Sequence, residues 1–263
     1  MKKITTLSFV FLMSLGLFAQ QQNQPLYLLF EFMKVNDEMN SDYMEVENFW
    51  TEIHKQRVAD GNIIGWDLWA MSPGGSEQGS QYFTVTLFSS LEAMLQGFPD
   101  GKFDEYLRKA HPNMSEEELG QWMEKTVVSR DIAHQVYCKE INNTEGDFDM
   151  PIGTLLKFDI MKQLDNSYEK VENDIFKPWH QQLVDNGQKE AWGLIKVLLP
   201  AGSQALGSHM TYSMYSSYKQ MAGDMEGGGG GTMDTMTGLA VKQGLETRDW
   251  RMVEAARLIM KVR

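Results

Sequence analysis

The chain has 263 residues, a formal net charge of −12 and a hydrophobic content of 42%. This length and apolar content are enough for two small domains with buried cores. The acidic balance argues against nucleic acid as a partner, because binding to nucleic acid requires clustered Lys and Arg. Cys138 is the one cysteine of the sequence, so no intrachain disulfide can form and stability must come from burial.

Residues 1–19 have the pattern of a signal peptide. Lys2 and Lys3 precede a largely apolar run, and Ala19 provides the expected cleavage site. The run is short for a bilayer span and no stop-transfer pattern follows it, so we expect no stable membrane insertion after signal cleavage. The alternative is a retained N-terminal anchor. The signal favours a bacterial protein that is periplasmic or secreted.

In the rest of the chain, one pattern occurs twice. The segment Tyr43-Met44-Glu45-Val46-Glu47-Asn48 returns as Tyr168-Glu169-Lys170-Val171-Glu172-Asn173, and His54, Gly61 and Trp66 return as His180, Gly187 and Trp192. A period of roughly 120 residues is that of a whole small domain and is too long for a solenoid unit. We therefore predict a first repeat over residues 20–141, a linker over 142–152 and a second repeat over 153–263.

The first repeat is predicted to begin with a strand at 26–35 and a helix that is capped by Ser41 or Asp42 and ends at Asp60-Gly61-Asn62. Strands at 63–71 and 81–88 follow, joined by a hairpin loop. Helical pieces are expected at 91–95, 103–110 and 115–125, the last opened by a capping box at Ser115. A fourth strand is expected at 126–138.

The second repeat is predicted to have the same order. It has a strand at 154–162, a helix at 167–186, strands at 191–199 and 209–216, a helix from Ser217 and a final strand from Glu246. Pro178 lies inside the long helix, where it removes a hydrogen bond, so we expect a kink or π-bulge beside it. The glycine run at 227–231 lacks the Gly-Lys-Ser/Thr ending of a phosphate-binding loop, and we expect a flexible loop there.

The order β-α-β-β-α-β is that of the split ferredoxin-like unit. Helices cover one face of such a sheet and leave the other face to be buried. Two sheets that face each other solve this problem for both repeats. We therefore predict an α+β fold in which two tandem ferredoxin-like βαββαβ repeats form an intrachain pseudo-dimeric α+β barrel.

On its element order, its duplication and the pattern Tyr-x-x-Val-Glu-Asn … His … Gly … Trp … Pro-x-Gly, the chain resembles the dimeric α+β barrel (ferredoxin-like) superfamily in its fused tandem form. It is similar to uncharacterised exported Bacteroidetes members. Members elsewhere include cofactor-independent monooxygenases, polyketide cyclases and haem-handling proteins. None of their catalytic signatures is matched residue by residue, so the resemblance implies a fold and no catalytic role.

His54 and His180 are the candidate catalytic residues. Each lies on the first helix of its repeat, four residues after an aromatic residue (Trp50, Phe176), at the edge of the apolar stripe. A neutral imidazole there can act as a base or hold a ligand. The alternative is a structural histidine whose ring bonds a carboxylate or a carbonyl group.

The candidate ligand-binding residues are Tyr43, Trp66, Tyr168, Trp192, Arg130 and Arg248. The four aromatic side chains either stack on a planar ligand or pack the core between helix and sheet. An arginine that points inward attracts an acidic substrate, and the alternative is an interdomain ion pair. Glu47 and Glu172 either act as acid and base across the pseudo-twofold axis or are solvated or paired locally.

No residue spacing typical of a metal site occurs, so we expect neither a metal nor a cofactor. A group of methionines in the second repeat has two interpretations, a soft Cu(I) site or ordinary core filling; its members are Met214, Met221, Met225, Met233 and Met236.

These features favour an exported protein that binds a small apolar or aromatic molecule in a barrel pocket, with cofactor-independent conversion if it is an enzyme. The alternative is a non-catalytic interaction or scaffold module of the cell envelope. A cavity above roughly 300 Å³ that a histidine reaches favours the first hypothesis, and a solidly packed barrel favours the second. The sequence leaves the substrate, the reaction and the oligomeric state open.

Overall fold

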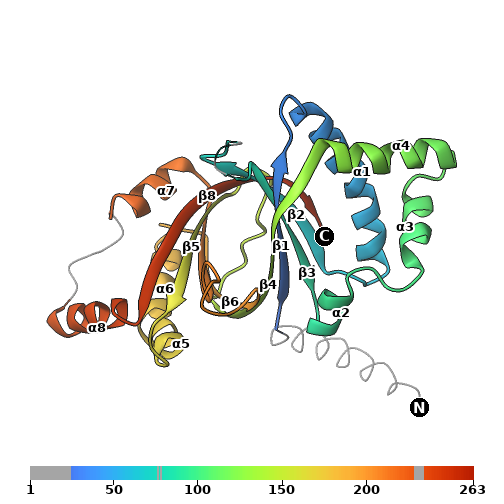
Figure 1. The fold of residues 1–263 in the computed structure, drawn as a ribbon. Coiled ribbons are helices and arrows are strands. Elements are labelled where there is room, and N and C mark those ends of the chain that lie inside the picture. The colour runs from blue at the N-terminus through green and yellow to red at the C-terminus, as the bar shows by residue number, and fades with distance from the viewer. Residues whose placement is uncertain (1–24, 76, 78, 228–233) are drawn as a thin grey trace, which may run out of the picture.

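The computed structural model describes residues 25–75, 77, 79–227 and 234–263 (Figure 1). The predicted signal peptide lies outside these residues, as does most of the glycine run. Within the described ranges, no helix combines the length and the apolar character that crossing a membrane requires.

The first repeat runs from β1 to β4. Its elements are β1 (Tyr27–Val35), α1 (Asn40–Ala59), β2 (Gly65–Ser72), β3 (Tyr82–Phe88), α2 (Leu91–Gln96), α3 (Lys102–Ala110), α4 (Glu116–Ser129) and β4 (Arg130–Asn143). Helix α1 buries Val46, Phe49 and Ile53, which follow one another at intervals of three and four residues and so share one face. Gly61 follows the helix with φ of +71°, the left-handed conformation that ends a helix at low cost in glycine.

The second repeat runs from β5 to β8 in the same order. Its elements are β5 (Leu155–Gln163), α5 (Tyr168–Val171), the π-helical turn η3 (Glu172–Phe176), α6 (Lys177–Asp185), β6 (Ala191–Leu199), β7 (His209–Tyr215), α7 (Tyr218–Met225), α8 (Thr235–Leu245) and β8 (Arg248–Val262). The distortion expected beside Pro178 is confirmed, because η3 ends two residues before that proline.

Three local predictions are wrong. Helix α1 begins at Asn40, after Met39, so neither Ser41 nor Asp42 caps it. The expected strand start at residue 126 is still helix, because Thr126 bonds within α4 and to Trp50, and β4 begins at Arg130. Helix α8 lies where the sequence predicts no element, opened by the side chain of Asp234 as its cap. The capping box at the start of α4, by contrast, is confirmed.

In the described part of the chain, eight strands form one closed barrel with the order β1-β3-β2-β8-β5-β7-β6-β4. The last strand of each repeat joins the two halves. Strand β4 begins beside β1, with Arg130 opposite Val35, and ends beside β6, with Tyr137 opposite Leu199. Strand β8 begins beside β5 and ends beside β2, with Trp66 opposite Val262. Each repeat therefore completes the sheet of the other, and the predicted pseudo-dimeric α+β barrel is confirmed.

The inner faces of the strands form the main hydrophobic core. It contains Phe30 and Phe83 from the first repeat together with Phe158 and Ile160 from the second. Phe83 and Phe158 meet edge to face across the lumen with ring centroids 5.5 Å apart. Figure 1 shows α1, α3 and α4 on one side of the barrel and α5 to α8 on the other, so the helices cover the outer faces of the strands.

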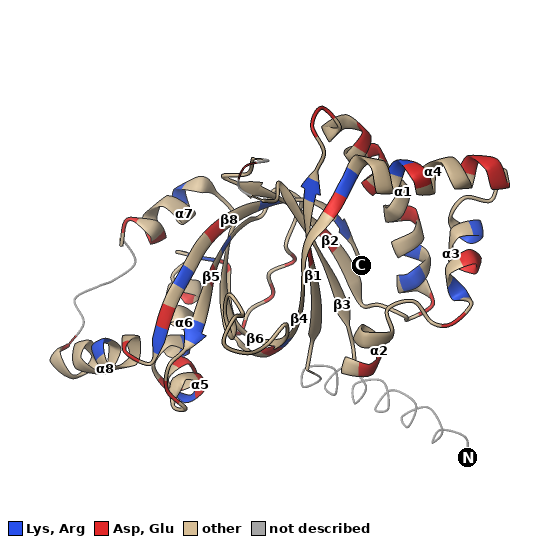
Figure 2. Cartoon of the chain, viewed as in Figure 1, with Lys and Arg blue, Asp and Glu red and all other residues tan. Residues whose placement is uncertain are grey.

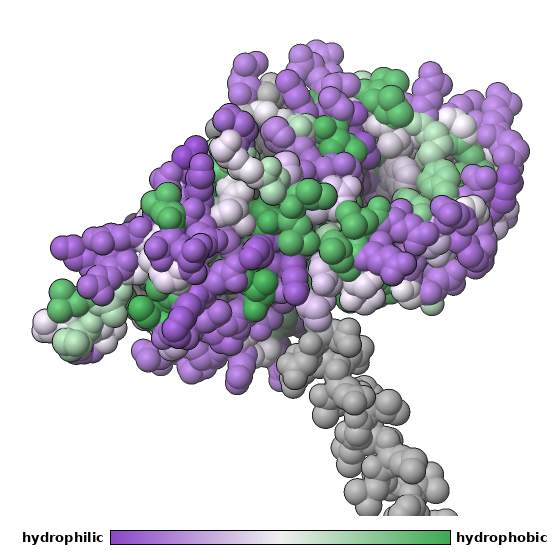
Figure 3. All heavy atoms as spheres, turned by 60° about the horizontal axis from the view of Figure 1, so that its bottom comes forward, coloured by the Kyte–Doolittle hydropathy of each residue, from purple (hydrophilic) through white to green (hydrophobic). Residues whose placement is uncertain are grey.

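The surface is polar and of mixed charge. Lys and Arg alternate with Asp and Glu along α3, α4 and β8 in Figure 2, and pairs such as Lys109–Glu105 and Lys125–Glu45 neutralise one another locally. On the face shown in Figure 3, hydrophobic residues form separate patches among hydrophilic ones. The basic groups are thus dispersed, unlike the clustered cations of a nucleic-acid-binding surface.

The mutual cover of the two sheets can be tested by truncation. Residues 20–145 alone expose the lumen face around Phe30 and Phe83 and leave the β2 and β4 edges without partners. We expect this fragment to self-associate or precipitate, because an open apolar sheet face with free edges is an association surface. Size-exclusion chromatography with light scattering measures the outcome against the full chain. A well-behaved monomeric fragment would contradict the model of two interdependent halves.

Candidate functional site

A cavity of about 460 Å³ lies in the first repeat, between α1, the outer face of the sheet and the segment around α2. We call it the helix–sheet cavity. Its aromatic lining residues are Trp50, Trp66, Phe88, Phe98 and Tyr137, and its charged or titratable lining residues are Glu31, Glu47, His54, Arg57 and Arg130. The volume is in the range of small-molecule sites, which combine apolar walls with a few convergent polar groups.

His54 forms part of one wall. Its ring stacks on Trp66 with the centroids 4.7 Å apart and the planes 18° apart. The Nη1 atom of Arg57 lies 3.5 Å from His54 Nδ1. Burial lowers the pKa of His54 well below its ordinary value, and the neighbouring Arg57 lowers it further. The imidazole is therefore neutral, and the Arg57 contact assigns the proton to Nε2, so His54 presents a hydrogen-bond donor instead of a base.

Arg57 is held rigidly beside the cavity. Its Nε donates to Asn62 Oδ1 at 2.7 Å and its Nη2 donates to the carbonyl of Gly97 at 3.2 Å. The guanidinium carbon lies 4.0 Å from the ring centroid of Phe98, which places the cation over an aromatic face. Burial lowers the pKa of Arg57 to about 10, so the side chain keeps its charge at neutral pH.

Glu47 is the strongest acid–base candidate of the cavity. It is buried, with 2% of its surface exposed, and its Oε1 has no hydrogen-bond partner in the described part of the chain. The same holds for the hydroxyl of Tyr43 and the Nε of Arg130. Burial raises the pKa of Glu47 to about 7, although the charge of Arg130 opposes the shift. A carboxyl group that titrates near neutrality beside a cavity is suited to proton transfer.

The second repeat contains the same histidine–tryptophan stack with a different cation. His180 stacks on Trp192 at 4.7 Å and 16°. Here Lys189 takes the place of Arg57, because its Nζ lies 3.3 Å from His180 Nδ1 and 3.1 Å from Asp224 Oδ1. Burial and then Lys189 lower the pKa of His180 well below its ordinary value. Both histidines are therefore neutral rings in contact with a buried cation.

The carboxylate of the second repeat is already paired. Glu172, the counterpart of Glu47, forms a buried ion pair with Arg248, the counterpart of Arg130. The guanidinium carbon of Arg248 also lies 4.0 Å from the ring centroid of Phe176. Phe176 ends η3 and packs against Gly244 of α8, where an added Cβ would lie 2.9 Å from the phenyl ring. The two repeats thus share one set of residues, and within the described ranges they differ in whether the carboxyl group forms an ion pair.

The predicted site residues do not meet in one pocket. His54, Trp66 and Arg130 line the helix–sheet cavity, and Tyr43 is buried beside it with no exposed surface. Tyr168 and Arg248 are buried together in the second repeat, where the guanidinium carbon of Arg248 lies 5.8 Å from the Tyr168 ring centroid. His180 is half-buried against Trp192, which also borders a cavity at the linker. The expected interdomain ion pair is wrong for Arg248, since its partner Glu172 belongs to the same repeat.

Three site residues were missed or misjudged. Glu47 and Glu172 are buried, so neither is solvated, and Glu172 is paired locally, as one alternative expected. The signal available in the sequence was their recurrence at the same place in both repeats. Arg57 has no counterpart in the second repeat, where the position is Leu183, so the duplication gave no signal for it. Only its contacts with Phe98 and Asn62 in the folded chain show that Arg57 belongs to the cavity.

The structure gives no support to a metal site. Among the described residues, no group of three His, Cys, Asp or Glu side chains is placed to hold a metal ion. The methionine group is dispersed: Met214 faces the barrel lumen, and Met225 and Met236 are exposed. Met221 projects from α7 onto Leu155 and Tyr215. Met233 lies outside the described residues. Core filling is the interpretation that fits Met214 and Met221.

Replacing Glu47 by glutamine tests the buried carboxyl group. Its pKa is about 7 in the folded chain against an ordinary value of 4.5, so its ionisation opposes folding as the pH rises through this interval. Wild type should lose stability between pH 5 and pH 8 relative to Glu47→Gln, and the gap should widen by on the order of 3 kcal/mol. Denaturant unfolding at both pH values measures it. Parallel stability curves would contradict a buried, unpaired Glu47.

Glu172→Gln is the matched control in the other repeat. This change leaves Arg248 buried without its ion-pair partner, so the variant should be less stable than wild type at both pH values, by roughly 3 kcal/mol. The opposite signs of the two substitutions separate an unpaired carboxyl group from a paired one.

Several solved structures share the fold of this chain. An anthrone oxidase-like protein aligns with a TM-score of 0.54 and 11% identity, over 92% of this chain and 94% of its own. A candidate monooxygenase from Fusobacterium nucleatum aligns with a TM-score of 0.52 and 6% identity, over 91% and 94%. A candidate monooxygenase from Lactobacillus acidophilus aligns with a TM-score of 0.50 and 9% identity, over 91% and 96%.

At these identities the likeness is one of fold. No protein-family model matches the sequence, and no curated protein matches it either. The shared architecture extends over nearly the whole length of each neighbour, so both repeats belong to it. The chain has the dimeric α+β barrel fold, formed here within one polypeptide.

Proposed function

We propose that the first repeat binds a small aromatic molecule with a weakly acidic hydroxyl group in the helix–sheet cavity, and that Glu47 accepts the proton of that hydroxyl. The observation that carries the proposal is the unpaired, buried Glu47 in a cavity of about 460 Å³, beside two arginines. This volume exceeds the roughly 300 Å³ at which small-molecule binding is favoured over a solid interior.

The walls of the cavity suit a planar ligand. Trp50 and Phe98 offer aromatic surface on which a ring can stack, and Trp66 is backed by the His54 ring. His54 Nε2–H can donate a hydrogen bond to a ligand oxygen, but with Nδ1 directed to Arg57 it has no free acceptor. The proton therefore goes to Glu47 in this proposal, and His54 serves as a positioning residue.

The charges of the cavity favour an oxyanion. When Glu47 is protonated, one carboxylate, Glu31, faces two guanidinium groups, Arg57 and Arg130. Glu31 is already hydrogen-bonded to Gln135 Nε2 at 2.8 Å. Transfer of the hydroxyl proton to Glu47 leaves negative charge on the ligand oxygen, and the two cations stabilise that charge in a site of low dielectric constant.

An aryl oxyanion is electron-rich at its ring carbons, which makes cofactor-independent conversion compatible with this site. The neighbours described as anthrone oxidase-like and as candidate monooxygenases are compatible with such chemistry, although their likeness to this chain is one of fold. Export to the periplasm or the outside, expected from residues 1–19, is part of the same proposal. The alternative, a scaffold module of the cell envelope, predicts that the cavity binds no small aromatic molecule.

The duplication supplies a matched test of binding. The probe is 1-naphthol, and the readout is quenching of tryptophan fluorescence. His54→Ala removes the ring that backs Trp66 and should weaken binding by about tenfold or more, the equivalent of losing one good contact. His180→Ala makes the same change in the other repeat and should leave binding unaffected. Equal effects of the two substitutions would place the ligand elsewhere.

Proton transfer has its own readout. The absorption of naphthol shifts to longer wavelength when its hydroxyl ionises. At pH 8 Glu47 is largely ionised, so bound 1-naphthol should show the naphtholate spectrum in wild type and the naphthol spectrum in Glu47→Gln. A naphtholate spectrum in both proteins would show that the arginines alone ionise the ligand.

A further inference from the structure

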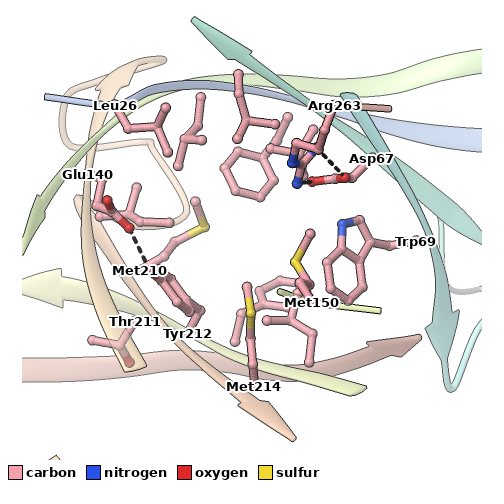
Figure 4. Close-up of a pocket in the computed structure, with 17 residues that line it drawn as sticks. Leu26, Asp67, Trp69, Glu140, Met150, Met210, Thr211, Tyr212, Met214 and Arg263 are labelled. Carbon is pink, nitrogen blue, oxygen red and sulfur yellow. Dashed lines mark hydrogen bonds and ion pairs between the residues drawn. The ribbon is translucent and has the colours of Figure 1, made fainter. Parts of the chain in front are cut away.

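A second cavity, of about 120 Å³, lies inside the barrel (Figure 4). We call it the lumen cavity. Both repeats contribute to it: Leu28, Phe30 and Trp69 come from the first, and Phe158, Met210 and Met214 from the second. Figure 4 shows the lining side chains around an open centre, with Trp69 and Met214 at its edge. The lumen cavity is separate from the helix–sheet cavity, because adjacent strand residues face opposite sides of the sheet.

The lumen cavity lies between packed aromatic rings and a wider cavity. Toward one end of the barrel, the Phe83 ring packs against Phe32 and Trp69, with centroid distances of 5.5 Å and 6.0 Å. At the other end the linker after β4 lies beside a wider cavity of about 370 Å³, which shares Met150, Tyr212, Met214 and Arg263 with the lumen cavity. The shared lining makes the side of Met150, beneath the linker, the expected route into the lumen.

The polar groups at this end contact one another in two pairs, one ion pair and one hydrogen bond. Arg263 Nη1 and Nη2 lie 2.8 Å and 2.9 Å from the carboxylate oxygens of Asp67. On the opposite side of the centre in Figure 4, Tyr212 donates its hydroxyl to Glu140 Oε1 at 2.6 Å. Gly193 makes room for the Tyr212 ring, which a Cβ there would approach to 2.4 Å. Because Asp67 pairs with Arg263, an anionic ligand would find no free cation among these four groups.

We propose that the lumen cavity is a second binding site, for an uncharged apolar ring of about the size of benzene. Apolar cavities of about 150 Å³ in proteins remain free of water and bind molecules of this size. Apart from Asp67, Glu140, Thr211, Tyr212 and Arg263, the lining consists of apolar side chains. These apolar side chains offer none of the two or more polar partners that a bound water needs. The three methionines adapt their unbranched side chains to the shape of such a ring.

The test uses the full chain with methionine methyl groups labelled with ¹³C, and toluene as the probe. The methyl resonances of Met150, Met210 and Met214 should shift with toluene in a saturable manner. Benzoate, which has the same ring with a negative charge, should leave them in place. Absence of a saturable toluene shift at these three methyl groups overturns the proposal, and so does an equal response to benzoate.

Neighbouring residues of β3 provide the variant and its control. Val85 faces the lumen cavity and Thr86 faces the helix–sheet cavity. Val85→Phe should fill the lumen and weaken toluene binding at least tenfold, whereas Thr86→Val should leave it unchanged. Undiminished toluene binding in Val85→Phe overturns the proposal. If Val85→Phe does not fold, Leu87→Phe fills the same cavity, and the location of the wild-type shifts decides independently.

The lumen site stands apart from the function proposed for the first repeat. Toluene binding at the three methionines and 1-naphthol binding beside Glu47 involve different side chains, so either can fail while the other holds.

Discussion

Burial of the two apolar sheet faces against each other is the interaction on which the other features of this structure depend. A single ferredoxin-like sheet covers one face with its own helices and leaves Phe30 and Phe83, or Phe158 and Ile160 in the second repeat, without cover. The long strands β4 and β8 then cross from one sheet to the other, so the barrel has no free edge. This closure fixes the helices on the outside, and both kinds of cavity follow from it.

The alternation of side chains along each strand separates these cavities. Trp66 and Thr86 point toward the helices, whereas Asp67 and Val85 point into the lumen. One sheet can therefore carry two chemically different environments, a polar one with titratable groups outside and an apolar one with paired ions inside. A substitution at one position need not disturb the cavity on the other face, which makes the two sites separable by mutation.

The two repeats have a glutamate and an arginine at matching positions, but these side chains interact differently in each repeat. In the second repeat Arg248 pairs with Glu172 under Phe176, and the π-helical turn and α8 hold this arrangement in place. In the first repeat the same carboxyl group has no such partner and its pKa rises to about 7. A buried, unpaired carboxyl group lowers stability, and its retention beside an open cavity is what a functional residue requires. The second repeat shows that an ion pair with arginine can neutralise the glutamate at this position.

The amino-acid sequence by itself determined the duplication, the order of the elements, the barrel and the distortion near Pro178, because these depend on periodicity and local propensity. It also singled out His54, Trp66 and Arg130, which recur in both repeats. Only the tertiary structure decided that His54 is a neutral donor stacked on Trp66, that Glu47 is buried and unpaired while Glu172 is not, and that Arg57 and Lys189 supply equivalent cations from different elements. Hydrogen-bond partners and burial arise from packing between segments far apart in the chain. A residue pattern that is the same in both repeats therefore cannot show that Glu47 and Glu172 differ in their partners.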